Sequence, residues 1–284
     1  MSTVPATERL PRQSEVDAFG ITHPGNVRGE NADQFLVLTL HKTSQVQSTS
    51  LPVEIVGPQT SEARAWLFLV ADGVGSGSGV RASEATLRHI SRYVTHATRL
   101  CYELDPSRQD VFQQELQNAV TRTHREVLQD ARQTGARGMA TTLTMVAFVW
   151  PRAYLVHAGD SRCYRLREGR LQQLTRDQTM AQALVDAGAL TSTSADRSPL
   201  KNVLTSAVGS EVLEPQVESD LCQWDDVLLL CTDGLTKHVS DAEIEAGLRE
   251  RRSSEDVARQ LLDLALERGG SDNITVVIGK LKTQ

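Results

Sequence analysis

The sequence has little cysteine, few aromatic residues and no long apolar run. Its four cysteines are Cys101, Cys163, Cys222 and Cys231. They show no Cys-x-x-Cys spacing, so neither a zinc ribbon nor a redox dithiol is indicated, and most are expected to be small apolar filling. Aromatic residues make up 4% of the chain, too few for a base-stacking surface. Apolar runs such as 66–71 are far shorter than the roughly 20 residues of a membrane-spanning helix.

Positive charge is also scarce. The chain carries 30 Lys and Arg against 36 Asp and Glu, a formal net charge of -6, which argues against nucleic acid as the main partner. Residues 1–15 are polar and contain two prolines, so we expect a flexible N-terminal segment and no signal peptide. These features together predict a cytoplasmic monomer that binds neither nucleic acid nor a membrane.

Short apolar runs and amphipathic stretches predict a mixed α+β fold. Runs rich in Val, Ile, Leu and Phe predict strands covered on both faces, at 34–39, 66–71, 142–149, 153–158, 227–231 and 274–278. Apolar residues at helical spacing predict two long successive helices over 82–101 and 112–131. A third helix is expected from Ser254 to the glycines at 269 and 270. Ser240 and Glu243 have the spacing of a capping box and predict a short helix.

The order of these elements differs from the strand–helix alternation of a doubly wound sheet. We therefore predict two mainly antiparallel sheets packed together with helices outside, around one composite core in a single domain over 16–281. Residues 41–61 are expected to form a long loop or an irregular hairpin. Residues 176–202 are expected to form a flap, with a small helix over 180–187 and a polar turn over 191–196.

Aspartates recur at the ends of the predicted strands. Three follow an apolar strand and two directly precede one, and they are Asp33, Asp72, Asp160, Asp233 and Asp272. If these strand ends meet on one rim, five carboxylates converge, which is destabilising unless their pKa values rise or cations bind between them. Oxygen-only ligands suit magnesium or manganese and not zinc or copper. An Asp-Gly pair after a strand is commonly only a turn, but the repetition favours a metal centre.

Six motifs in chain order resemble a known family. They are Arg28-Gly-Glu-Asn31-Ala-Asp33, Ala71-Asp72-Gly73-Val-Gly75, Gly138-Met-Ala-Thr141-Thr142, Gly159-Asp160-Ser161-Arg162, Cys231-Thr-Asp233-Gly234-Leu235-Thr236 and Ser271-Asp272-Asn273. Over residues 16–279 the series resembles the metal-dependent type 2C serine/threonine protein phosphatases, the PPM family, and its bacterial single-domain members in particular. The resemblance implies a four-layer αββα fold with a binuclear manganese or magnesium centre between the sheets.

The resemblance also implies roles for individual residues. The core ions would be held by three carboxylates and one carbonyl, those of Asp72, Asp233, Asp272 and Gly73. Asp33 would act through metal-bound water and completes the expected catalytic set with the three core aspartates. Asp160 matches the position that helps Asp233 to hold a weaker third ion. Arg28 matches the arginine that binds the substrate phosphate, to which it would offer planar bidentate donors.

The implied reaction is hydrolysis of phosphoserine and phosphothreonine in proteins. A bridging water activated by two metal ions roughly 3.5–4 Å apart would attack phosphorus, and no protein nucleophile would be needed. Phosphorylated proteins and a cognate Ser/Thr kinase would be the partners. Three positions depart from the family pattern, namely Ala32 in place of Glu or Gln, Ala140 in place of Gly, and Val74 in place of the histidine that protonates the leaving oxygen in animal members. Water would then supply that proton.

Other functions remain open on the sequence. A partner-binding module without turnover would be expected to lose some of the five aspartates, and a metal-dependent nucleotide or phosphodiester hydrolase would need a base pocket that the few aromatics do not indicate. The glycines over 73–79 follow a strand, but they lack both the Gly-x-Gly-x-x-Gly and the Gly-Lys-Ser/Thr spacing of nucleotide loops. A cysteine-based phosphatase would need a thiolate near an arginine, and no cysteine has an arginine six residues later.

Overall fold

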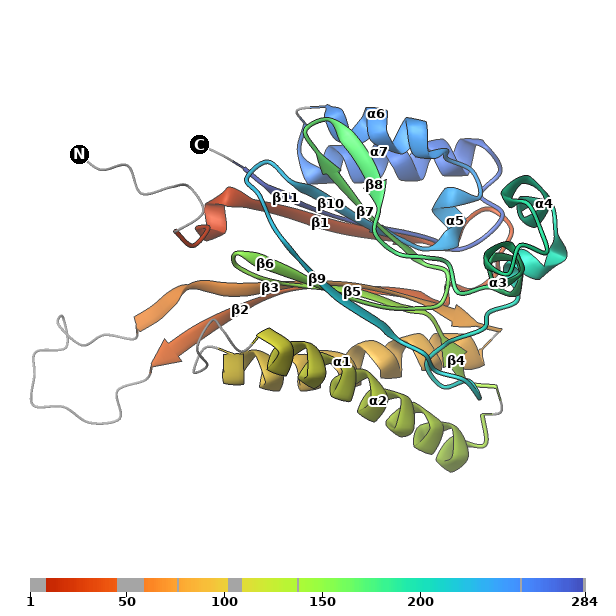
Figure 1. Ribbon diagram of the computed structural model, residues 1–284, viewed down its shortest axis with the longest axis horizontal. Coiled ribbons are helices and arrows are strands. Elements are labelled where there is room, and N and C mark those ends of the chain that lie inside the picture. The colour runs from red at the N-terminus through yellow and green to blue at the C-terminus, as the bar shows by residue number, and fades with distance from the viewer. Residues whose placement is uncertain are drawn as a thin grey trace, which may run out of the picture.

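The computed structural model of this chain describes residues 9–44, 59–75, 77–101, 109–136, 138–250 and 252–282. Within these residues two sheets lie face to face, and every pairing between their strands is antiparallel. Helices cover both outer faces, which gives four layers (Figure 1). The predicted αββα sandwich is therefore confirmed. In the same ranges, no helix combines the length and the apolar character needed to cross a membrane.

The first sheet has five strands. In spatial order they are β1 (Val16–His23), β11 (Ile274–Leu281), β10 (Val227–Cys231), β7 (Arg162–Arg167) and β8 (Arg170–Gln173). The second sheet contains, in order, β2 (Asp33–Ser44), β3 (Gln59–Val74), β5 (Leu143–Val149), β6 (Arg152–Ala158) and β9 (Gln216–Leu221), with β4 (Ala140–Thr141) paired to the end of β3.

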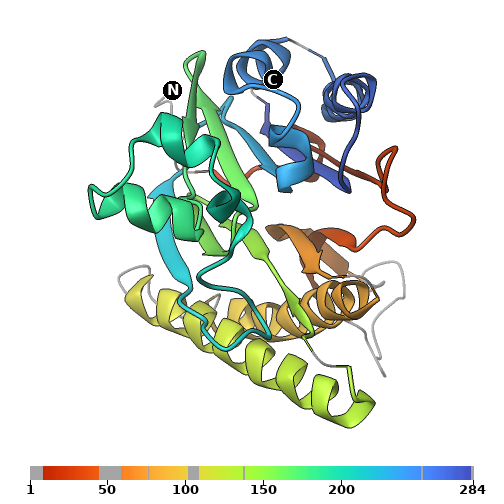
Figure 2. The same cartoon turned by 90° about the vertical axis from the view of Figure 1, so that its right-hand side faces the viewer.

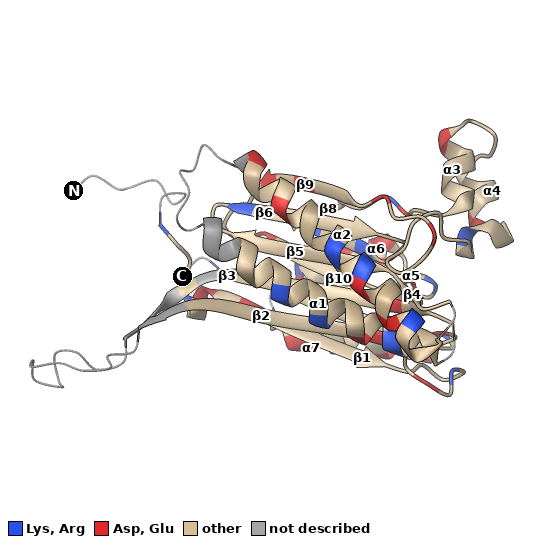
Figure 3. Ribbon diagram, turned by 90° about the horizontal axis from the view of Figure 1, so that it is seen from below, with Lys and Arg blue, Asp and Glu red and all other residues tan. Residues whose placement is uncertain are grey.

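Two pairs of helices form the outer layers. The second sheet is covered by α1 (Ser78–Cys101) and α2 (Gln109–Thr134), and the first by α6 (Asp241–Arg249) and α7 (Ser254–Glu267). Charged residues of both signs mark the sides of α1 and α2 that face away from the sheet (Figure 3), as expected for amphipathic surface helices.

The remaining short helices gather at one end of the sandwich, apart from η1 (Gln13–Glu15) ahead of β1. They are α3 (Met180–Asp186), α4 (Ser192–Asp196), η2 (Pro199–Asn202) and α5 (Asp233–Thr236). In Figure 1 this end also contains β4, and Figure 2 looks directly onto it, with the predicted flap in teal.

The continuous apolar runs are explained by burial on both faces. In β3, Trp66, Phe68 and Val70 pack in the core between the two sheets, whereas the alternate residues Leu67 and Leu69 pack against the helices. Because side chains alternate across a strand, a strand with two buried faces shows no polar positions. The same alternation places Asp72, two residues after Val70, on the face between the sheets.

Several predicted boundaries change. Residues 41–44 and 59–61 belong to the paired strands β2 and β3, with irregular register, so of the two alternatives for 41–61 the described ends favour the irregular hairpin. Residues 45–58 lie outside the described residues. Of the N-terminal segment, residues 1–8 lie outside the described residues. The predicted turn over 191–196 is wrong. It is the helix α4, because the Thr191 hydroxyl caps the start of the helix by accepting from the amide of Ser194.

Candidate metal centre

A pocket of about 930 Å³ opens at the end of the sandwich where α5 follows β10. Four of the predicted carboxylates line it, those of Asp72, Asp160, Asp233 and Asp272, together with Gly73 and Arg28. The fifth, Asp33, is buried behind them, with its side chain 1% exposed. The structure thus brings all the sequence-predicted site residues together, from both sheets and from the loops that follow their strands.

Asp33 and Asp72 lie opposite each other in the register of β2 and β3. The Oδ2 atom of Asp33 accepts hydrogen bonds from the hydroxyls of Thr232 and Thr275, both at 2.7 Å. These two threonines belong to the other sheet, so the contact ties the two sheets together at the pocket. The second oxygen, Oδ1, is buried and has no hydrogen-bond partner in the structure. A buried carboxylate oxygen without a partner is costly, and a bound cation would satisfy it.

The backbone of Asp72 is fixed by a pair of threonines. Its carbonyl accepts from the Thr141 hydroxyl at 2.7 Å and from the Thr142 amide at 2.9 Å, and its own amide donates to the Thr142 hydroxyl at 2.9 Å. The Thr141-Thr142 motif therefore positions the Asp72 carboxylate from β4 and the start of β5. The sequence singled out these threonines but assigned them no structural role.

Two glycines at the site allow backbone segments to touch. A Cβ on Gly73 would lie 2.2 Å from the carbonyl oxygen of Gly79, and a Cβ on Gly234 would lie 1.9 Å from the carbonyl oxygen of Asn273. Both distances are too short for a real carbon atom, so these positions accept only glycine without a backbone shift. Gly73, near the end of β3, and Gly79, in the first turn of α1, let the helix pack against the strand, and Gly75 and Gly77 have the positive φ of the turn between them. These roles account for the glycines without a nucleotide.

Asp233 and Asp272 share a lysine that sequence reasoning missed. The Nζ atom of Lys237 lies 2.6 Å from Asp233 Oδ2 and 2.7 Å from Asp272 Oδ2. Arg28 also contacts Asp272, with its Nε 2.7 Å from Oδ1. Although burial acts to raise the pKa of Asp272, hydrogen bonds from Arg28 and Lys237 hold that pKa below its ordinary value. The helical spacing of four residues from Asp233 to Lys237 was the available signal.

Within the described residues, Asp33, Asp72 and Asp160 make no ion pair of this kind, and their pKa values are raised. Burial, with the neighbouring aspartate charges, raises the pKa of Asp33 and that of Asp160 to about 7, from 3.8. Burial and Asp33 likewise raise the pKa of Asp72 well above its ordinary value. Raised pKa values across a cluster of carboxylates are the expected result when like charges converge without counter-ions.

The donor set fits hard divalent cations. Oxygen atoms are the only side-chain donors that the five aspartates provide, and Asp233 Oδ1, like Asp33 Oδ1, is buried without a hydrogen-bond partner. Over the described ranges, no three His, Cys, Asp or Glu side chains already stand in a ready-made ion-binding group. Asp272 is paired with Lys237 and Arg28 and not grouped with the other carboxylates. The chemistry of the site therefore fits magnesium or manganese, with some rearrangement of the side chains on binding.

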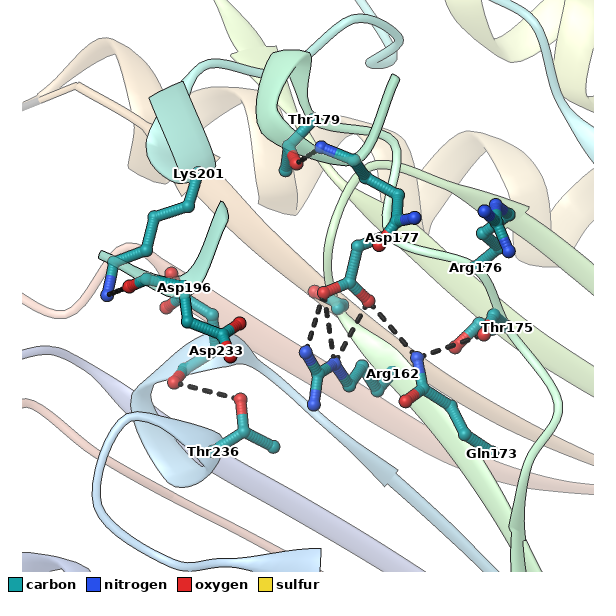
Figure 4. A network of polar contacts seen from close by, with 12 residues as sticks. Arg162, Gln173, Thr175, Arg176, Asp177, Thr179, Asp196, Lys201, Asp233 and Thr236 are labelled. Carbon is teal, nitrogen blue, oxygen red and sulfur yellow. Dashed lines mark hydrogen bonds and ion pairs between the residues drawn. The ribbon is translucent and has the colours of Figure 1, made fainter. Parts of the chain in front are cut away.

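The turn that holds Asp160 is tied to the flap. Arg162 donates to both carboxylate oxygens of Asp177, at 2.9 and 2.7 Å (Figure 4). It also donates to the Tyr164 hydroxyl at 3.0 Å. The amide of Gly159 donates to the side-chain oxygen of Gln178 at 2.9 Å. These contacts anchor the first residues of the flap beside the carboxylate of Asp160, a connection that the sequence did not predict.

Asn273 holds the loop that carries Arg28. Its Oδ1 accepts from the amide of Ala32 at 2.9 Å, and its Nδ2 donates to the carbonyls of Pro24 and Glu30, both at 2.9 Å. One side chain thus fixes three points of the segment between β1 and β2. This role explains the asparagine in the Ser271-Asp272-Asn273 motif, to which the sequence analysis assigned no function.

The described cysteines do not supply a nucleophile. Cys163, Cys222 and Cys231 are buried and free. Burial raises the pKa of Cys163 to about 12 and shifts those of the other two upward as well, so no reactive thiolate forms among them near neutral pH. For these three, the prediction of apolar filling is confirmed, while the Cys101 side chain lies outside the described part.

The chain is similar in sequence to known phosphatases. The sequence model of the family described as Protein phosphatase 2C matches residues 57–275. The serine/threonine protein phosphatase PstP of Mycobacterium tuberculosis is 43% identical over 141 residues, which are 50% of this chain and 27% of that relative. The serine/threonine phosphatase stp of Listeria monocytogenes is 33% identical over 218 residues, 75% of this chain and 83% of that relative. The match to PstP thus spans only about a quarter of the length of that relative.

Solved structures agree with the fold. The crystal structure of the Mycobacterium tuberculosis phosphatase PstP/Ppp superposes with a TM-score of 0.74 at 29% identity, covering 94% of this chain and 99% of that chain. A second structure, of the catalytic domain of PstP in complex with two manganese ions, has a TM-score of 0.70 at 28% identity, with the same coverage of both chains. With a matching family model over most of its length, the chain belongs to the protein phosphatase 2C family.

Proposed function

We propose that this protein is a metal-dependent serine/threonine protein phosphatase that hydrolyses phosphoserine and phosphothreonine in protein substrates. The observation that carries the proposal is the convergence of five aspartates from both sheets on one pocket with an exposed arginine in its wall. Membership of the protein phosphatase 2C family supports it. The names of relatives such as PstP and stp support the substrate class.

The proposed cofactors are two core manganese or magnesium ions and a third, weaker one. Asp72, Asp233, Asp272 and the Gly73 carbonyl would hold the core ions, Asp33 would contribute through water, and Asp160 would join Asp233 at the third. The related PstP structure in complex with two manganese ions supports manganese as the metal and two as the number of core ions. When bound, such ions activate the attacking water and offset the negative charge that develops on the phosphoryl oxygens.

The residues of the chain bind and orient the substrate. The Arg28 side chain is 57% exposed at the pocket wall, with its Nε and Nη2 paired to Asp272, so the part of the guanidinium that does not pair with Asp272 is accessible to a phosphate. No histidine is found among the described residues that line the pocket, and Val74 stands after Gly73. Solvent water is therefore the proposed proton source for the leaving hydroxyl of serine or threonine.

The partners follow from this chemistry. We infer phosphorylated proteins as substrates, a cognate Ser/Thr kinase as the source of those phosphates, and a cytoplasmic monomer as the working form. A nucleotide hydrolase is less favoured, because none of the described residues that line the pocket is aromatic and a base would have no stacking surface.

The proposal is tested by hydrolysis of a phosphothreonine peptide. Chelator-treated protein is expected to be inactive, to gain activity with added manganese, and to lose at least 100-fold in kcat with Asp72→Asn or Asp233→Asn, as expected when a transition-state contact is removed. Asp263→Asn, on the outer helix α7, is the matched control and should keep full activity. Turnover that persists in chelator or in both site variants would refute the proposal.

A further inference from the structure

Lys237 lies inside the proposed metal centre, and neither the sequence motifs nor the comparisons assign it a role. It directly follows α5, four residues after Asp233, which places its side chain back over the aspartate. Its ammonium lies 2.6 Å from Asp233 Oδ2 and 2.7 Å from Asp272 Oδ2, and its side chain is 28% exposed. It therefore bridges two carboxylates that come from different loops.

This ammonium is one of two cations on the pocket wall. Arg28 and Lys237 are the only Lys or Arg among the described residues that line the pocket. Arg28 makes its ion pair with Asp272, whereas Lys237 reaches both Asp233 and Asp272. Lys237 thus pairs with two of the three carboxylates that are proposed to hold the core ions.

We propose that Lys237 is a tethered cation that occupies the edge of the centre between Asp233 and Asp272 in the metal-free chain and competes there with the divalent ion. This inference rests on the proposed metal site. The ammonium offsets the repulsion between the two carboxylates, and its flexible four-carbon stem allows it to leave when an ion binds. Lys237 then stabilises the metal-free fold and weakens metal binding, so it sets the metal concentration at which the enzyme becomes active.

Competition predicts opposite effects on the two states. Lys237→Gln removes the ammonium and keeps a polar side chain of similar length. Manganese affinity of the whole chain, measured by calorimetry, is expected to rise about tenfold, equivalent to one charge-assisted hydrogen bond of about 1.4 kcal/mol. The melting temperature in chelator is expected to fall. Lys237→Arg keeps the charge and should lie near the wild type on both measurements.

Lys282→Gln is the matched control. Lys282 also pairs with an aspartate, with its Nζ 2.8 Å from Asp17 Oδ2, but it lies beyond the end of β11 and outside the pocket. This variant changes the net charge of the chain by the same amount, so a general charge effect on manganese affinity would appear in it equally. We expect its manganese affinity to match that of the wild type.

Equal or weaker manganese affinity in Lys237→Gln would overturn the inference. If the manganese affinity is unchanged and the KM for a phosphopeptide is higher, Lys237 binds the substrate phosphate and does not compete with the metal ion. The failure of the proposed function has a different signature, which is the absence of manganese-dependent hydrolysis in the wild type and the Lys282→Gln control alike. Affinity and hydrolysis measured on the same samples therefore separate the two.

Discussion

Asp33 and Asp72 are directly paired across β2 and β3 on the face between the two sheets. One oxygen of Asp33 is tied to the opposite sheet through Thr232 and Thr275, and the other is buried without a partner. The pairing brings together the buried carboxylate of Asp33 and the carboxylate of Asp72 on the pocket wall, and burial together with the like charges raises their pKa values. Protonation or a bound cation therefore stabilises this arrangement.

Replacing Asp33 tests this electrostatic cost. The folded chain keeps the Asp33 proton up to about pH 7, whereas the unfolded chain loses it near the ordinary value of 3.8. The folded state therefore binds more protons in this range, and the stability of the metal-free chain falls as the pH rises from about 4 to about 7. Asp33→Asn removes that loss. In chelator at pH 8 the variant is expected to be more stable than the wild type by a few kcal/mol, since each unit of pKa difference corresponds to about 1.4 kcal/mol.

Thermal unfolding in chelator across this pH range checks the prediction. The difference between the variant and the wild type should shrink as the pH falls toward and below the ordinary value of 3.8, where Asp33 becomes protonated in both the folded and unfolded states. A difference that does not change with pH would show that packing, and not the charge of Asp33, is responsible.

Arg28→Ala is expected to raise the KM for a phosphopeptide more than it lowers kcat. Loss of a ground-state contact to the phosphate acts mainly on KM. Arg28→Lys should recover only part of the affinity, because a lysine lacks the planar pair of donors. Steady-state kinetics with saturating manganese measure both parameters. An unchanged KM in Arg28→Ala would remove Arg28 from the phosphate site.

Asn273→Ala is expected to loosen the segment between β1 and β2. The amide side chain makes three hydrogen bonds to that segment, and their loss leaves backbone groups without partners at a cost of about 1–3 kcal/mol. Because Arg28 lies on the same segment, KM should rise together with the loss of stability. Asn118→Ala on α2 is a control for the loss of an amide. Normal kinetics in Asn273→Ala would limit Asn273 to a stabilising role.

Arg162→Ala is expected to release the start of the flap from Asp177. Hydrolysis of a phosphopeptide should fall more than hydrolysis of a small aryl phosphate, because the flap borders the pocket and the small substrate does not reach it. The ratio of the two kcat/KM values measures the effect. Arg259→Ala, which removes a surface pair with Glu255 on α7, should leave the ratio unchanged. Equal losses for both substrates would exclude a role of the flap in peptide selection.

The sequence predicted the strands whose residues are nearly all apolar and missed strands that mix polar and apolar residues. The run 227–231 coincides with β10 because both faces of this strand are buried and every side chain is apolar. By contrast, β7 alternates arginines with apolar residues, and β9 is a partly exposed edge strand. Their composition resembles that of a loop, and only the pairing with neighbouring strands determines them.

The site was predictable to a similar degree. All five aspartates stand at strand ends, and that placement alone indicated a shared rim. Lys237 and Asn273 were not predicted, because their roles depend on the distance between α5, the β1–β2 segment and the residues before β11. Those distances arise from the packing of the two sheets, which no local sequence pattern specifies.

The most direct measurement is anomalous X-ray diffraction at the manganese edge from crystals of this chain soaked in manganese. We expect two strong peaks among Asp72, Asp233 and Asp272, with the Lys237 ammonium displaced from both of its carboxylates. Peaks elsewhere on the surface, or an unchanged Lys237 bridge with no peak in the pocket, would contradict the central claim that these aspartates form a binuclear metal centre.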